Sequence, residues 1–192
     1  MGMTETLVQR LAQWATEQPE RPALHARRGS GWHTRTWSDY WRSVREVAKG
    51  LIALGHEVGD CVAIVGQNRP EWVIAQFGVM AARGVPAPIY TNNTVEQTAF
   101  IVDHSQSNIA IADNDERLQK YRDGKAQGLM KAEHLVLMDE PGADQDDVIG
   151  LAALRARGRE LDDAVLDERL GAVDPHETAI LIYTSGTTGT PK

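Results

Sequence analysis

Residues 61–90 read CVAIVGQNRPEWVIAQFGVMAARGVPAPIY and predict a strand, a helix and a second strand in succession. The first five residues form a short apolar run, and Val85–Tyr90 form another. Between them, Asn68 is expected to cap a helix that has Pro70 in its first turn and runs to Arg83. Two short apolar strands joined by a helix are typical of parallel pairing, because parallel strands need a crossover connection.

A membrane span is the alternative interpretation of part of this stretch. Residues Trp72–Tyr90 number nineteen and are mostly apolar, which is the length that a bilayer requires. However, the run contains Arg83, Pro86 and Pro88. An arginine near the centre of a span costs about 3 kcal/mol on insertion scales. We therefore expect a buried helix and a buried strand rather than a span.

The alternation of strand and helix continues to the end of the chain. Further strands are expected over Ile109–Ala112, Leu135–Met138 and Ala179–Tyr183. Helices are expected over Glu5–Glu17, from Ser38 to Leu54, from the Thr94–Gln97 capping box to His104, and over Glu116–Tyr121, Val148–Arg157 and Asp163–Leu170. A hairpin is expected over Ala23–Trp37. This pattern predicts the α/β class, with a layered, mostly parallel sheet flanked by helices.

Composition excludes several classes of protein. The 192 residues carry 27 acidic and 20 basic side chains, a formal charge of −7, which disfavours nucleic acid as a partner. Cys61 is the single cysteine, so an internal disulfide and a multi-thiolate metal site are ruled out, and a cytoplasmic location is expected. The six histidines include no pair at helical i, i+4 spacing, which disfavours a metal site.

The residues that follow the last apolar run have the composition of a phosphate loop. Residues 184–192 read TSGTTGTPK. Gly186 and Gly189 allow the backbone to approach a ligand closely, and successive backbone N–H groups in such a turn form an anion-binding concavity. The hydroxyl groups add short donors, and Lys192 adds a mobile positive charge. The alternative is a surface loop that is rich in glycine and threonine by chance.

Three better-known motifs do not match this loop. A Walker A motif would need Gly-Lys five residues after Gly186, where Pro191 stands. A nucleophile elbow would need glycine at Tyr183. The chain contains no G-x-G-x-x-G sequence, so a dinucleotide oxidoreductase has no support.

Residues 183–192, YTSGTTGTPK, resemble the phosphate-loop signature of the adenylate-forming (AMP-binding) enzymes. That superfamily includes acyl-CoA synthetases, the adenylation domains of peptide synthetases and firefly luciferase. Three upstream segments, 50–55, 68–72 and 89–97, resemble its long-chain fatty acyl-CoA synthetase branch. The resemblance extends from about Thr36 to Lys192.

This resemblance implies a two-step reaction. A fatty acid carboxylate attacks the α-phosphate of ATP, giving an acyl-adenylate and pyrophosphate, and coenzyme A then displaces AMP. Both steps develop charge on phosphate oxygens, which a donor-rich loop and Mg²⁺ stabilise. By the resemblance, Thr184 would contact the Mg²⁺ ion. The residues that would hold the β- and γ-phosphates are Thr184, Ser185, Gly186, Thr187, Thr188, Gly189 and Lys192.

The resemblance also implies a partial domain. Residues 1–192 are expected to be the N-terminal part of the large AMP-binding domain of an acyl-CoA synthetase-like fold, ending at the phosphate loop 183–192. The remainder of that domain and the C-terminal domain are expected to be absent, so no catalytic residue is assigned and the fragment is expected to be inactive alone.

Other functions and partners remain open at this point. The alternatives are another adenylate-forming enzyme, acting on a medium-chain, aryl or amino acid, and a non-catalytic ATP-binding module. The expected small-molecule partners are a fatty acid, ATP and coenzyme A. A homodimer and peripheral contact with a membrane are kept open as well, although the sequence has no basic amphipathic helix.

Overall fold

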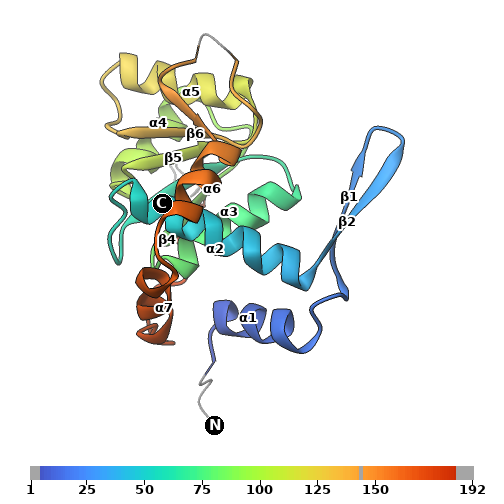
Figure 1. Ribbon diagram of the computed structural model, residues 1–192. Helices are drawn as coiled ribbons and strands as arrows, with labels where there is room; N and C mark the ends of the chain where they lie inside the picture. Colours follow the sequence, from blue (N-terminus) through green and yellow to red (C-terminus); the bar gives the residue numbers. More distant parts are fainter. Residues whose placement is uncertain (1–4, 143–144, 185–192) are drawn as a thin grey trace.

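The computed structural model describes residues 5–142 and 145–184 of the chain (Figure 1). Its centre is a five-stranded parallel sheet in the order β4-β3-β5-β6-β7. The strands are β3 (Cys61–Val65), β4 (Val85–Ile89), β5 (Ile109–Ala112), β6 (His134–Leu137) and β7 (Val148–Gly150). The predicted α/β class and the parallel sheet are therefore confirmed.

Helices cover both faces of this sheet (Figure 1). One face packs against α2 (Trp37–Ala53), α3 (Pro70–Ala81) and α6 (Leu151–Glu160), and the other against α4 (Val95–His104) and α5 (Asp115–Ala126). Successive strand residues point to opposite faces, so Val62 and Ile64 join the first layer while Ala63 and Val65 join the second. Burial on both faces explains why these strands are continuously apolar.

Three peripheral elements pack outside the sheet. Helix α1 (Leu7–Glu17) lies against α2, and α7 (Asp163–Gly171) lies against α2 and α3. Strands β1 (Pro22–Arg28) and β2 (Gly31–Thr36) form the predicted antiparallel hairpin, which projects from the body beside α2 (Figure 1). The first helix and the hairpin are thus confirmed.

Two of the predicted helix caps are wrong by one or two residues. Helix α2 is capped by Thr36 rather than Ser38, and the Asp39 N–H donates to the Thr36 hydroxyl at 3.2 Å. Helix α3 begins after Arg69 rather than Asn68, with Pro70 in its first turn and no side-chain cap. Thr36 completes a capping box with Asp39, whereas proline at the first helical position needs no N–H acceptor.

The segment after Val148 is a strand before it becomes a helix. Sequence periodicity predicted a helix from Val148, but Val148–Gly150 pair with β6 as strand β7, and α6 begins at Leu151. The open edge of β6 provides hydrogen-bonding partners that a helix would leave unused. Long-range pairing therefore decides the conformation of these three residues.

The predicted strand Ala179–Tyr183 is not part of the sheet. These residues run beside the edge strand β4, and the Leu181 N–H donates to the Pro86 carbonyl at 3.0 Å. The backbone groups of residues two apart in a strand point to the same side, so the nitrogens of Pro86 and Pro88 both face the open edge of β4. Proline has no N–H, so neither nitrogen can donate a hydrogen bond there. The reciprocal hydrogen bonds of a ladder therefore cannot form along these positions.

The described part of the chain contains no helix that is long and apolar enough to cross a membrane. The stretch Trp72–Tyr90 instead forms most of α3 and all of β4, as predicted.

Candidate functional site

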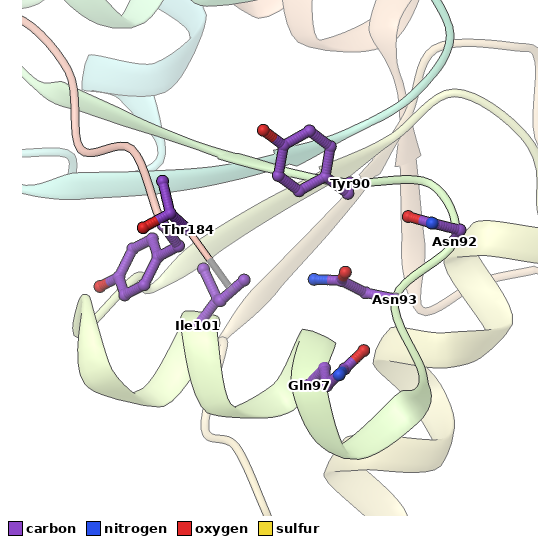
Figure 2. A pocket seen from close by; sticks show the side chains of 7 residues that line it. Tyr90, Asn92, Asn93, Gln97, Ile101 and Thr184 are labelled. Carbon is purple, nitrogen blue, oxygen red and sulfur yellow. The ribbon is translucent and has the colours of Figure 1, made fainter. Parts of the chain in front are cut away.

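A cavity of about 400 Å³ opens beside the carboxyl end of β4 (Figure 2). Thr184 and Ile101 lie on one side of it, and Asn92 and Asn93 lie on the other. Thr184 is the one residue of the predicted phosphate-binding set that the structure describes. The remaining predicted positions, Ser185, Gly186, Thr187, Thr188, Gly189 and Lys192, lie outside the described residues.

The turn before helix α4 and the start of that helix form another part of the wall. Tyr90 directly follows β4, and the capping box of Thr94 and Gln97 starts α4, with the Gln97 N–H donating to the Thr94 hydroxyl at 3.3 Å. The predicted capping box is thus confirmed, and it also lines the cavity through Gln97.

A lysine from α5 orders the same turn. The ammonium group of Lys120 donates to the carbonyl oxygens of Thr91 at 3.0 Å and Asn93 at 2.7 Å. The sequence offers no signal for this contact, because 27 and 29 positions separate the lysine from its acceptors. The lysine thereby fixes the backbone that presents Asn92 and Asn93 to the cavity.

The described residues that line the cavity are mostly of polar type, and none of them is charged. Two asparagines, a glutamine, a threonine and two tyrosines contribute hydrogen-bonding groups, and Ile101 contributes an apolar surface. Side-chain amides both donate and accept, so this wall suits a ligand group that carries both donors and acceptors. A charged ligand would have to take its counter-charge from outside these seven residues.

Tyr183 anchors the chain just before Thr184. Its ring is 8% exposed, and its hydroxyl lies 2.9 Å from His104 Nδ1 at the end of α4. Burial raises the pKa of the Tyr183 hydroxyl, so this group stays protonated at neutral pH. The sequence analysis did not identify His104 as part of the site.

The crevice between β3 and β5 is closed by the protein itself. Helices α3 and α5 leave these adjacent strands on opposite faces, which is where open α/β sheets commonly bind ligands. Here Asp113 fills the position: its carboxylate accepts from the Gln67 N–H at 2.8 Å and from Arg117 Nη1 at 3.0 Å. Asp113 precedes the Asn114 cap of α5 and is 3% exposed.

Glu71 extends this network toward the hairpin. Glu71 lies in the first turn of α3, and its carboxylate pairs with Arg28, Arg35 and Arg69. Burial raises the pKa of Glu71, but the hydrogen bond and charge of Arg69, with the charge of Arg28, lower it overall. The network therefore joins the hairpin to the carboxyl edge of the sheet and serves structure.

In residues 5–142 and 145–184, the side chains that could bind a metal ion are dispersed. Within these ranges, no group of three or more His, Cys, Asp or Glu side chains is arranged to hold a metal ion. Burial raises the pKa of the Cys61 thiol, so the thiol stays protonated, as expected of a structural residue rather than a nucleophile.

Curated relatives are similar in sequence to most of this chain. Long-chain-fatty-acid–CoA ligase ACSBG2 of Homo sapiens is 32% identical over 171 residues, which are 89% of this chain and 26% of that protein. Long-chain-fatty-acid–CoA ligase ACSBG1 of Rattus norvegicus is 32% identical over 171 residues, 88% of this chain and 24% of that protein. The chain therefore spans about a quarter of the length of these relatives.

Solved structures share the fold. The adenylation domain of a carboxylate reductase from Mycobacterium chelonae superposes with a TM-score of 0.80 at 24% identity, covering 100% of this chain and 34% of that one. A fatty acyl-adenylate ligase from L. pneumophila, in complex with acyl adenylate and pyrophosphate, gives a TM-score of 0.70 at 19% identity, over 97% of this chain and 29% of that one.

The sequence pattern of the family described as AMP-binding enzyme matches residues 11–192. This range includes the hairpin, the parallel sheet, the cavity and the glycine- and threonine-rich loop. Sequence pattern, fold and loop thus agree, and the chain belongs to the AMP-binding enzyme family.

Proposed function

We propose that this chain is the N-terminal part of an AMP-forming long-chain fatty acid–CoA ligase. One observation carries the proposal: the first two residues of the loop signature, Tyr183 and Thr184, line a 400 Å³ cavity at the carboxyl edge of the sheet. The 32% identity to named long-chain-fatty-acid–CoA ligases supports the choice of substrate class.

The proposed reaction has two steps. A fatty acid carboxylate oxygen attacks the α-phosphorus of ATP, the bond to the β-phosphate bridging oxygen breaks, and pyrophosphate leaves. The thiolate of coenzyme A then attacks the acyl carbonyl carbon, and AMP leaves with the former carboxylate oxygen. In this scheme Thr184, Ser185, Gly186, Thr187, Thr188, Gly189 and Lys192 hold the β- and γ-phosphates.

Magnesium would contribute charge neutralisation at the same phosphates. Among the described residues, Thr184 supplies a single hydroxyl oxygen at this place, and no acidic cluster accompanies it. This donor set fits Mg²⁺ that takes most of its ligands from phosphate and water, as the ion commonly does. Thr184 is the residue that would hold the ion.

The proposal includes the domain arrangement. Residues 1–192 would form the first part of the AMP-binding domain, and activity would require the further sequence that the relatives possess. The coverage of 24–26% of the curated ligases supports this view.

Fatty-acid-dependent pyrophosphate release is the decisive test. The full-length protein, given ATP, Mg²⁺ and palmitate, should release pyrophosphate only when the fatty acid is present. Replacing Lys192 by alanine should reduce this rate by about 100-fold, because charge stabilisation at a transition state is commonly worth that much. Release without fatty acid, or with an aryl or amino acid instead, would contradict the substrate class.

A matched control separates binding from folding. Thr184→Ala removes a hydroxyl at the cavity, whereas Thr34→Ala removes an exposed hydroxyl on the hairpin. The first should raise the KM for ATP, and the second should leave it unchanged. Equal effects of the two substitutions would contradict a role of the loop in ATP binding.

A further inference from the structure

The segment before the glycine- and threonine-rich loop is tied to α4 through a side chain. The Tyr183 hydroxyl lies 2.9 Å from His104 Nδ1, and the two rings meet edge to face with centroids 5.7 Å apart. His104 is in turn stacked on Phe100, one helical turn earlier, with centroids 5.4 Å apart and planes at 26°. The imidazole is thus held between a buried tyrosine and its own helix.

A ladder of backbone hydrogen bonds cannot hold residues 179–183 against β4. The Leu181 N–H reaches the Pro86 carbonyl, but Pro86 and Pro88 offer no N–H in return. A segment that is denied a full ladder keeps a fixed position only if its side chains hold it. Tyr183 is the most buried residue of this segment, at 8% exposure.

The contact between His104 and Tyr183 also restricts the position of the next residue, Thr184. Consecutive Cα atoms are 3.8 Å apart, so a fixed Tyr183 leaves Thr184 little freedom of position. Tyr183 is buried. Its neighbour Thr184 is exposed at the wall of the cavity (Figure 2). The hydrogen bond of His104 therefore acts on the first residue of the loop.

We propose that His104 is a positioning residue, which holds Tyr183 so that Thr184 is aligned with the phosphates of ATP. This assignment rests on the proposed function, because it presumes that the loop binds a nucleotide. His104 does not itself touch the nucleotide. Its effect passes through the hydroxyl of Tyr183.

Variants of both partners test the contact in the full-length protein. Tyr183→Phe removes the hydroxyl, and His104→Leu removes the ring nitrogen while retaining an apolar side chain. Each should weaken the affinity for MgATP by about 3- to 10-fold, the effect of one lost hydrogen bond. The double variant should be no weaker than either single variant, because both remove the same interaction.

A conservative variant distinguishes positioning from a general structural role. His104→Asn retains a hydrogen-bonding atom near the position of Nδ1 and should restore most of the affinity. His25→Leu is the matched control, since His25 Nδ1 lies 2.9 Å from the Thr34 hydroxyl on the hairpin, which projects from the body (Figure 1). It should leave the affinity unchanged.

Amide hydrogen exchange supplies a readout that does not depend on the nucleotide. In the absence of ATP, His104→Leu and Tyr183→Phe should accelerate exchange at residues 181–184, and His104→Asn should not. Unchanged exchange in the first two variants would overturn the proposal. So would accelerated exchange with unaltered affinity for MgATP, or a His104→Asn variant as weak as His104→Leu.

The same measurements separate this inference from the proposed function. A wild-type protein that fails to bind MgATP refutes the proposed function, and the role of His104 in nucleotide alignment falls with it. A wild-type protein that binds MgATP no more tightly than its His104→Leu variant refutes the role of His104 alone.

Discussion

The two faces of the sheet are filled by side chains of different size. Large aliphatic residues point toward the α2/α3/α6 face: Val62, Ile64, Ile109, Ile111 and Val136. Among the described core residues of the sheet, four of the nine on the α4/α5 face are alanines, whereas the α2/α3/α6 face has none. The four are Ala63, Ala87, Ala110 and Ala112. The α4/α5 face is also the one that carries the cavity, through Ile101 and Tyr183.

The supporting elements of the two faces differ as well. Helix α2 packs against α1, α3, α6 and α7, and glycines allow α2 and α6 to pack backbone to backbone. The α4/α5 face has two helices and relies on individual hydrogen bonds, such as those of Lys120 and His104, to hold its loops. We infer that the α2/α3/α6 face gives rigidity, while the α4/α5 face presents the site. Four predictions test this contrast.

The largest effect is expected where α2 and α6 cross. A Cβ atom on Gly158 would overlap the Glu46 carbonyl oxygen and lie 2.8 Å from the Gly50 nitrogen. Gly158→Ala should lower the free energy of unfolding by about 3 kcal/mol or more, because backbone atoms must move apart. Urea denaturation measures this change.

Helix propensity alone predicts the opposite sign, since alanine is favoured over glycine inside a helix by about 1 kcal/mol. Gly171→Ala at the end of α7 is the control, because no atom of the described residues would lie within 4 Å of a Cβ atom there. A Gly158→Ala variant as stable as this control would show that the crossing is loosely packed.

The next effect concerns acid stability at the amino-terminal edge of the sheet. His56 is 3% exposed, and burial, with the nearby Arg169 as a further cause, lowers its pKa from 6.5 to about 4, while Asp60 raises it. The unfolded chain therefore binds a proton at higher pH than the folded chain. Stability is full above about pH 6.5 and should fall by up to about 3 kcal/mol as the pH drops toward 4.

Thermal unfolding at pH 7 and pH 4.5 measures this dependence. A His56→Gln variant cannot titrate here, so its stability should change less between the two pH values than that of the wild type. An identical change in both proteins would assign the acid sensitivity to the carboxylates instead.

A third prediction compares adjacent residues of β5 that point to opposite faces. Ala110→Val adds two methyl groups beneath α4 and α5 and should cost about 2 kcal/mol through overpacking. Ile111→Val removes one methyl group on the other face and should cost about 1 kcal/mol. Denaturant unfolding measures the free energy of unfolding of both variants. An Ala110→Val variant as stable as the wild type would show that the α4/α5 face can accommodate two more methyl groups.

The smallest effect is expected at the start of α4. Thr94→Ala removes the cap that accepts from the Gln97 N–H and should cost about 1 kcal/mol. Thr6→Ala removes the equivalent cap of α1, where the Gln9 N–H donates to the Thr6 hydroxyl at 3.2 Å, and serves as the control. Both should lower stability, but Thr94→Ala alone should also weaken ligand binding at the cavity, as measured by the affinity for MgATP.

Local sequence patterns predicted the buried strands and the capped start of α4 correctly. The strands Cys61–Val65 and Ile109–Ala112 have the predicted bounds, and the Thr94 capping box starts α4 as expected. The loop signature also predicted the family that residues 11–192 match. Each of these features depends on residues that are close together in the chain.

The errors fall where a distant partner decides. Val148–Gly150 became a strand because β6 offered an open edge, and Ala179–Tyr183 stayed outside the sheet because its neighbour β4 presents Pro86 and Pro88. Glu71 is buried because Arg28 and Arg35 of the hairpin neutralise it, and the buried Asp113 carboxylate accepts from the distant Gln67 N–H. No local pattern contains that information.

The sequence by itself determined the alternation of strands and helices, the burial of the sheet on both faces and the loop that identifies the family. These follow from periodicity, from capping and from a contiguous motif. Only the tertiary structure decided which residues close the crevice between β3 and β5 and how closely α2 and α6 approach each other. It also decided that His104 contacts Tyr183 and that Lys120 contacts the turn beside the cavity. The physical reason is that hydrogen bonds, ion pairs and steric contacts act over a few ångströms in space, whatever the separation of their partners in sequence.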